Sequence, residues 1–172
     1  YSNLQSCWLG RKKAGGVFTQ EKMDSDMNEA DLIVKKTLEI IDYFDCEYWF
    51  MENPQTGKLK KREFMKDIPF YDVSYCMYSD WGYEKKTRIW TNKKDWSNKI
   101  CDKSGACGNM VESQHKLVCD GGYDKRKKHK LNVSKDVHTV GEQKEKGKLK
   151  QGTNQLDRYR IPEDLIFSLF LD

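Results

Sequence analysis

The chain has 172 residues, of which 37% are apolar and 34% charged, and its formal net charge is +4. This length suits one domain with a modest core, and an aromatic share of 12% excludes an intrinsically disordered chain. No apolar run reaches the roughly 18 residues of a membrane-spanning helix, and the start of the chain lacks a signal-peptide layout, so we expect an intracellular protein with no membrane partner.

The first third of the chain predicts a loop, a helix and a strand. Residues 1–20 are polar and predict a loop. Residues 26–44 predict an amphipathic helix, because apolar side chains recur there at spacings of three and four. These side chains are Leu32, Ile33, Leu38, Ile40, Ile41 and Phe44. The apolar run 48–51 predicts a buried strand, closed by a turn at Glu52-Asn53-Pro54.

Two further strands are predicted over residues 71–78 and 87–91, with Gly82 in the turn between them. Their short connection predicts a hairpin. A helix that leads into a buried strand is half of a parallel α/β unit, so we expect an α/β fold with this hairpin at one edge of the sheet. A last helix is predicted from Pro162, which suits a first helical position and is followed by two acidic residues.

Residues 93–158 form a charged, glycine-containing insert, whereas residues 1–92 and 159–172 carry the regular pattern. Between Gly121 and Lys150 the insert holds ten Lys or Arg and four Asp or Glu, a net charge of +6. Such a basic block suits a polyanion, and we expect it to contact DNA. The candidate DNA-binding residues are Lys125, Arg126, Lys127, Lys128 and Lys130. The alternative is a solvated loop that binds nothing.

Six cysteines are present, and without a signal peptide we expect them to be reduced. Cys46 and Cys76 lie in apolar segments and are expected in the core. The insert adds the pattern Cys-x5-Cys-x7-His-x3-Cys, formed by Cys101, Cys107, His115 and Cys119. Three thiols and one imidazole can form a tetrahedral structural zinc site. A segment with few core residues needs such a site to stabilise its fold. The alternative is a set of unrelated free thiols.

Two clusters could carry chemistry. Glu52 follows a predicted buried strand, where ligands bind in α/β sheets, and apolar neighbours would partly desolvate its carboxyl group. Its alternative role is to cap a neighbouring helix. Lys86 and Arg88 point to one face of the third predicted strand and could hold phosphate or a base edge. On that strand alone, a solvated edge protected by lysine is the favoured interpretation.

Together these segments resemble the DNA cytosine-5 methyltransferase family, in its phage and large-virus branch. Glu52-Asn53-Pro54 is similar to the family's Glu-Asn-Val motif, with Pro in third place as in that branch. Residues 84–90 resemble the Gln-x-Arg-x-Arg motif, with Glu84 for Gln and Lys86 for the first Arg. The tail from Tyr159 is similar to the closing Val-Pro helix. The resemblance covers residues 26–92 and the tail, in the family's order.

The resemblance implies a partial Rossmann-like methyltransferase sheet and a specific mechanism. A cysteine thiolate adds to carbon 6 of a flipped-out cytosine, and carbon 5 then takes a methyl group from S-adenosylmethionine. Glu52 would hydrogen-bond the ring nitrogen and the exocyclic amine, with Asn53 supporting its loop. Lys86 and Arg88 would bind the cytosine carbonyl oxygen, the DNA backbone or the catalytic loop.

Two parts of the family pattern do not occur in these residues. Tyr1-Ser2 resembles the end of the family's Pro-Cys motif, which would place the nucleophile just before Tyr1, and Cys7 lacks the Pro-Cys context. The glycine-rich cofactor loop would lie further upstream. We therefore expect these residues alone to be inactive and to need an N-terminal half, in the same chain or as a separate one. The alternative function is a non-catalytic nucleic-acid-binding or assembly subunit derived from this fold.

Overall fold

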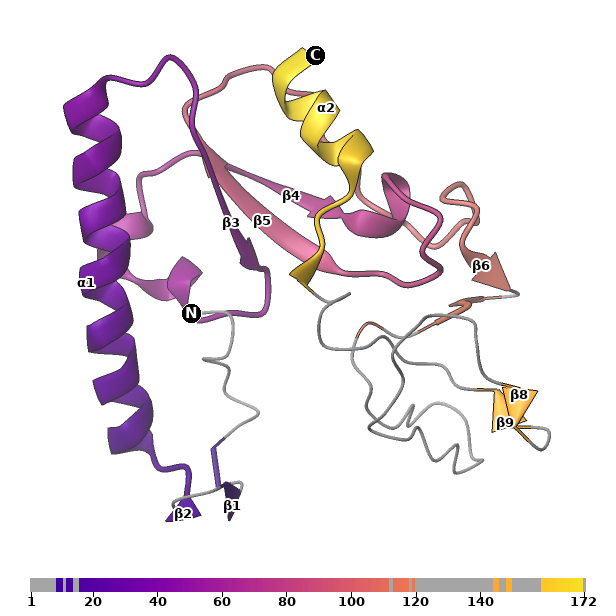
Figure 1. Cartoon of the computed structure of the whole chain (residues 1–172), viewed down its shortest axis with the longest axis horizontal. Helices are drawn as coiled ribbons and strands as arrows, with labels where there is room; N and C mark the ends of the chain where they lie inside the picture. The colour runs from indigo at the N-terminus through magenta and orange to yellow at the C-terminus, as the bar shows by residue number, and fades with distance from the viewer. Residues whose placement is uncertain are drawn as a thin grey trace. The chain divides into compact units, whose positions relative to one another are not determined.

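The computed structural model describes residues 9–10, 12–13, 16–111, 113–117, 119, 144–145, 148–149 and 159–171. It is a mixed structure of helices and small antiparallel sheets (Figure 1). Two compact units are present: Tyr1–Asp72 with Thr87–Asp95, and Val73–Lys86 with Trp96–Asp172. Within the described ranges, no helix has the length and apolar character needed to cross a membrane.

Helix α1 (Gln20–Phe44) is the longest element of the first unit. The Thr19 side chain caps it by accepting a 3.2 Å hydrogen bond from the amide of Lys22. It ends at Asp45, whose left-handed backbone (φ 48°) lets its N–H bond the carbonyl of Asp42. The helix predicted over residues 26–44 is confirmed, but it begins six residues earlier, where polar side chains give no apolar repeat.

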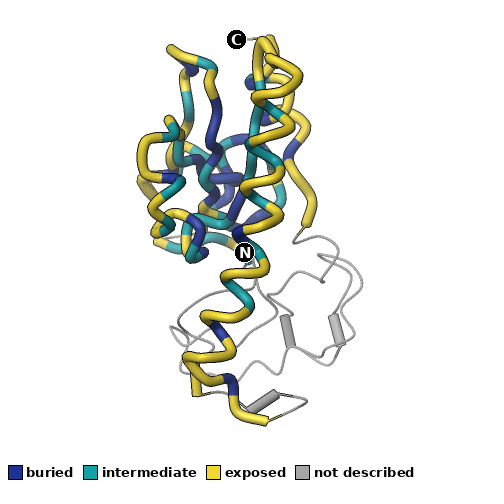
Figure 2. The backbone as a smooth tube through the Cα atoms, turned by 90° about the vertical axis from the view of Figure 1, so that its left-hand side faces the viewer, coloured by how far each residue is buried: buried dark blue, intermediate teal, exposed yellow. Residues whose placement is uncertain are grey.

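The buried face of α1 differs from the predicted one. Its inward side chains recur at the helical repeat and are Met23, Met27, Ala30, Val34 and Leu38. Four residues of the predicted apolar face are exposed instead, namely Leu32, Ile33, Ile40 and Phe44. Figure 2 shows that exposed residues run along much of the helix. The sequence pattern failed here because apolar side chains occupy two faces of α1.

The first unit contains most of a three-stranded sheet with the order β3-β5-β4. Its strands are β3 (Phe50–Pro54), β4 (Phe70–Ser74) and β5 (Lys86–Thr91). The predicted pairing of the second and third strands is confirmed, because β4 and β5 are neighbours. β5 also pairs antiparallel with β3.

The turn predicted at Glu52-Asn53-Pro54 is wrong, since all three residues belong to β3. A residue before proline is pushed toward extended backbone, which continues a strand as readily as it ends one. Proline is tolerated there because β3 is an outer strand and Pro54 is its last residue. The turn follows one step later, where the amide of Gly57 donates to the carbonyl of Pro54 at 2.8 Å.

The core of the first unit lies between α1 and the sheet. Trp90 of β5 packs with Leu59 and Met65, which come from two short 3-10 helices, η2 (Leu59–Lys61) and η3 (Glu63–Met65). Val34 and Leu38 of α1 cover this cluster. Cys46 is exposed, so its predicted place in the core is wrong.

A partly buried ion pair lies beside this core. Asp31, only 6% exposed, accepts hydrogen bonds from the Nε and Nη2 groups of Arg62. A buried carboxylate needs such a partner, because removing an unpaired charge from water is costly.

In the second unit the predicted strand 71–78 splits into the end of β4 and a 3-10 helix, η4 (Tyr75–Met77). A small hairpin joins β6 (Met110–Val111) to β7 (Gln114–His115). Two further pairs are β1 (Lys12–Lys13) with β2 (Gly16–Val17), in the first unit, and β8 (Lys144–Glu145) with β9 (Lys148–Leu149).

The predicted last helix is confirmed as α2 (Glu163–Leu171), which starts directly after Pro162. The carbonyl of Pro162 accepts the amides of Leu165 and Ile166. Leu165 and Leu169 are buried, whereas Phe167 and Phe170 are exposed, so only one side of this apolar helix is packed.

Candidate functional site

Glu52 and Asn53 are consecutive residues of β3, and their side chains lie on opposite faces of the sheet. Glu52 pairs with Ile89 of β5, and Asn53 pairs with Arg88. Successive side chains of a strand point to opposite faces, and directly paired residues share a face. The half-buried Glu52 is therefore on the face of Ile89, while Asn53 is on the face of Arg88. The structure brings these predicted residues onto one strand pair without gathering them on one surface.

Arg88 is held in place by two neighbours. Its Nε donates to Oδ1 of Asp72 at 2.8 Å, and its Nη2 donates to Oδ2 at 2.9 Å. The guanidinium carbon lies 3.5 Å from the ring centroid of Phe70, a cation–π contact. These contacts use two of the five N–H groups of the guanidinium. Arg88 thus has a fixed direction and donors to spare for a ligand.

Asp72 shows the electrostatic effect of this arrangement. Burial acts to raise the pKa of its carboxyl group, but hydrogen bonds from Arg88 and Gln55 and the charge of Arg88 outweigh it and hold that pKa below its ordinary value. Gln55 Nε2 donates to Asp72 Oδ2 at 2.8 Å. Asp72 was not among the predicted site residues, although its place in a strand next to a predicted basic strand was a usable signal.

Asn53 is only 8% exposed, and its Oδ1 atom has no hydrogen-bond partner in the described part of the chain. The turn after β3 comes close to this atom, because a Cβ added at Gly57 would overlap Asn53 Oδ1. A buried acceptor without a partner is unusual and often marks a functional position.

Lys86, the first residue of β5, is placed differently from Arg88. Its side chain is 47% exposed, and its Nζ lies 3.7 Å from Glu84 Oε1. The Glu84 side chain is only 16% exposed, and its Oε1 atom is buried without a hydrogen-bond partner in the described part of the chain, so the pair is partly buried. The Lys86 ammonium is the solvent-exposed member of this pair, so a ligand can reach it from the surface.

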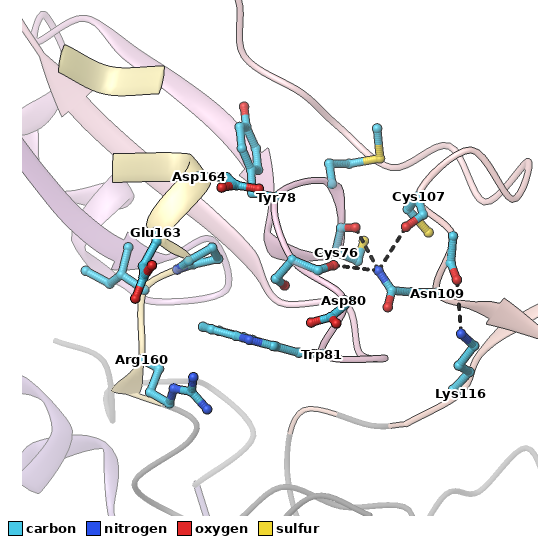
Figure 3. Close-up of a pocket in the computed structure, with 15 residues that line it drawn as sticks. Cys76, Tyr78, Asp80, Trp81, Cys107, Asn109, Lys116, Arg160, Glu163 and Asp164 are labelled. Carbon is cyan, nitrogen blue, oxygen red and sulfur yellow. Dashed lines mark hydrogen bonds between the residues drawn. The ribbon is translucent and has the colours of Figure 1, made fainter. Parts of the chain in front are cut away.

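The second unit has a cavity of about 660 Å³, drawn in Figure 3. Its lining includes three carboxylates, Asp80, Glu163 and Asp164, and two cationic side chains, Lys116 and Arg160. Arg160 covers the ring of Trp81, with 4.6 Å between the guanidinium carbon and the ring centroid. The surplus of carboxylates makes this cavity unsuited to a phosphate group.

Asn109 joins the segments that form this cavity. Its Nδ2 group lies within 2.7–2.9 Å of the carbonyls of Cys76, Ser79 and Cys107 (Figure 3). Its Oδ1 atom accepts a 2.9 Å hydrogen bond from the amide of Gly82. Gly82 itself needs to be glycine, because its φ is +82° and a Cβ would press on Leu117. No sequence pattern pointed to Asn109, which is 1% exposed.

A cluster of three cysteine thiols and one histidine imidazole borders the same cavity. One ligand atom from each of Cys76, Cys101, Cys107 and His115 lies within 4.8 Å of all the others. The Sγ atoms of Cys101 and Cys107 are 3.6 and 3.7 Å from Nε2 of His115. Burial, reinforced by the neighbouring thiols, raises the pKa of Cys76, and burial also raises the pKa of Cys101.

This group differs from the predicted zinc set at one position. Cys101, Cys107 and His115 come together as expected, but the fourth member is Cys76, which was predicted only as a core residue. Among the described residues, Cys119 is not in the group. Cys76 was missed because it lies 25 residues before Cys101, outside any local spacing pattern.

The predicted DNA-binding residues Lys125, Arg126, Lys127, Lys128 and Lys130 lie outside the described residues. The extent of the insert over residues 93–158 stays a prediction.

Comparison with known proteins supplies one relative. The chain is similar to a curated protein of Frog virus 3 (isolate Goorha) described as a probable DNA (cytosine-5)-methyltransferase. The two are 30% identical over 176 residues, which covers 98% of this chain and 68% of the relative. No family model and no solved structure matches the chain. The alignment therefore spans both strands that carry the candidate residues.

Proposed function

The chain belongs to the DNA cytosine-5 methyltransferase family, and on that premise we propose that it is the part of such an enzyme that binds DNA and activates the target cytosine. The observation that carries this proposal is the viral relative, whose similarity runs through almost the whole chain and not through one motif. S-adenosylmethionine, when bound to the complete enzyme, supplies the methyl group. The proposed reaction needs a cytosine turned out of the double helix, because its ring atoms are hidden in the base stack.

Glu52 is the proposed base-activating residue. A carboxyl group that hydrogen-bonds the ring nitrogen and exocyclic amine of cytosine makes carbon 6 easier for a thiolate to attack. Glu52 suits this role because it is half-buried on an outer strand, so its carboxyl group is partly desolvated yet reachable. Asn53, whose buried Oδ1 touches the turn at Gly57, supports the backbone that carries Glu52.

Arg88 and Lys86 have separate proposed roles. Arg88 lies on the opposite face from Glu52 and is fixed by Asp72, so we assign it to the DNA backbone or the catalytic loop and not to the base contacted by Glu52. The Lys86 side chain is 47% exposed, which suits a contact with a phosphate. The basic residues 125–130 are proposed to add further phosphate contacts.

The remaining proposals concern the enzyme as a whole. The order β3-β5-β4, with β3 and β5 antiparallel, fits the edge of a partial Rossmann-like methyltransferase sheet. The thiolate and the cofactor loop are proposed to come from an N-terminal half upstream of Tyr1. Zinc, the second predicted cofactor, would be structural and take no part in methyl transfer.

The test compares this chain with a version extended upstream to include the Pro-Cys segment. Transfer of labelled methyl groups from S-adenosylmethionine to DNA is measured for both, and we expect activity only in the extended protein. In that protein Glu52→Gln should lower kcat by about 100-fold or more, since a positioned acid–base group contributes on that scale. Glu63→Gln, at an exposed position, is the matched control.

The same assay separates the two functions. Full methylation by Glu52→Gln would remove Glu52 from its role. DNA binding by the extended protein, with neither methyl transfer nor S-adenosylmethionine binding, would favour the non-catalytic nucleic-acid-binding subunit.

A further inference from the structure

We propose that Cys76, Cys101, Cys107 and His115 bind one structural zinc ion that fastens the segment after β4 to the following loop and to β7. The observation that points to this site is the convergence of four metal-binding side chains from three separate segments of the second unit. Cys76 comes from η4, Cys101 and Cys107 from the loop before β6, and His115 from β7.

The distances suit a tetrahedral zinc centre. With Zn–S bonds of about 2.3 Å and a Zn–N bond of about 2.0 Å, tetrahedral angles place a sulfur and a nitrogen ligand about 3.5 Å apart. The two Sγ–Nε2 distances are 3.6 and 3.7 Å. All four ligand atoms also lie within 4.8 Å of one another, so one ion can reach them with small movements.

The chemistry of the group also suits zinc. Three sulfurs and one nitrogen form a closed set of four ligands, which is typical of a structural site and leaves no position for a substrate. Cys76 is 1% exposed and Cys101 is 6% exposed, and neither is in a disulfide. A bound cation explains why three cysteine thiols, two of them buried and one partly buried, lie so close together.

The surrounding backbone holds the ligands in position. Asn109 Nδ2 donates to the carbonyls of Cys76 and Cys107, so one side chain fixes two ligand residues. Between Cys101 and Gly108 the chain turns back through Gly105, at φ +101°, and the amide of Gly108 bonds the carbonyl of Gly105 at 2.9 Å. Outer contacts of this kind orient metal ligands before the metal arrives.

The site has a consequence for the cavity in Figure 3. Cys76 and Cys107 are part of its wall, together with Trp81 and Asn109. A zinc ion bound to these residues would therefore hold part of the cavity wall in place, without contacting a ligand bound in the cavity. Loss of the ion should loosen the second unit, because metal binding and folding are coupled in such sites.

The test measures zinc directly, so its result does not depend on methyltransferase activity. The full chain is purified under reducing conditions with Zn²⁺, and bound metal is quantified by mass spectrometry. We expect about one zinc per chain in the wild type and in Cys119→Ser, and less than about one fifth of that in Cys76→Ser. A metal-free folded wild type, or zinc lost in Cys119→Ser and kept in Cys76→Ser, would overturn the proposal.

A second measurement uses only the wild type, in case Cys76→Ser does not fold. Thiol alkylation is mapped by peptide mass spectrometry before and after removal of zinc with a chelator. Cys76, Cys101 and Cys107 should react only after chelation, whereas the exposed Cys46 should react at once. Equal reactivity of Cys101 and Cys107 with and without chelator, or a disulfide within the group, would refute the site.

Discussion

Arg88 of β5 meets Asp72 of β4 through two parallel hydrogen bonds of 2.8 and 2.9 Å, and this pair links neighbouring strands of the sheet. An ammonium group cannot reproduce the two-point geometry of a guanidinium. Arg88→Lys should therefore lower the free energy of unfolding by about 1.5–3 kcal/mol, measured by urea denaturation. Lys66→Arg, at an exposed position, should change it by less than about 0.5 kcal/mol.

The same pair predicts a dependence of stability on pH. The pKa of Asp72 is lowered in the folded protein, so the folded state binds a proton at this carboxylate less readily than the unfolded state does. The stability that the Asp72 carboxylate contributes is complete above its unfolded pKa of about 3.9. It is lost as the pH falls through the lower pKa of the folded protein. Urea midpoints between neutral and acid pH should therefore fall less steeply for Asp72→Asn than for the wild type. An unchanged slope in Asp72→Asn would contradict the pairing.

Gly57 should tolerate no larger side chain while Asn53 is present. An added Cβ would overlap the buried Oδ1 of Asn53, and overpacking of this kind costs about 1–3 kcal/mol. We expect Gly57→Ala to lose stability on that scale and to lose methylation in the extended enzyme, because Glu52 is adjacent. In the double variant Asn53→Ala/Gly57→Ala the overlap is removed, so its loss should be smaller than the sum of the single losses. Additive losses would show that the two residues do not interact.

Asn109→Ala should destabilise the second unit strongly. The amide side chain serves three carbonyls and one amide in a buried place, and each buried group left unsatisfied costs about 1–3 kcal/mol. Thermal unfolding and hydrogen exchange at Gly82 are the measurements. Asn28→Ala on the exposed side of α1 is the control and should be neutral or slightly stabilising, since alanine favours helix.

The two faces of α1 can be told apart by alanine substitution. Leu38 packs on the core cluster around Trp90, so Leu38→Ala should cost about 1–3 kcal/mol. Ile33 is 71% exposed, and Ile33→Ala should cost less than about 0.5 kcal/mol in this chain. Equal losses in urea denaturation would mean that the helix is rotated relative to the described structure.

The sequence predicted the elements better than their faces. α1, α2 and β5 were found because a helical repeat, a proline start and a β-branched run are local signals. The inward face of α1 was not found, since exposed Leu32 and Ile33 look the same in sequence as the partly buried Val34. Local pattern shows that a residue is apolar, and only the partner element decides whether it is buried.

The candidate site residues also divide into those marked by a local sequence pattern and those defined only by contacts in the folded chain. Glu52 and Arg88 came from contiguous motifs, whereas Asp72, Asn109 and Cys76 act through contacts 16 to 33 residues away along the chain. Three members of the predicted zinc set, Cys101, Cys107 and His115, lie together in the structure, and they are also close in sequence. Its fourth member could not be chosen by spacing, since the turn at η4 that presents Cys76 depends on the folded sheet.

The sheet order also governs how this protein can fold during synthesis. β5 is the middle strand but the last of the three to be made, so β3 cannot form its described ladder until about 30 further residues have been added. At a ribosomal rate of about 5–20 residues per second, that delay is about 2–6 s. During it, the apolar residues Trp49 and Met51, which later pack on Trp90, remain without their core and need protection from aggregation.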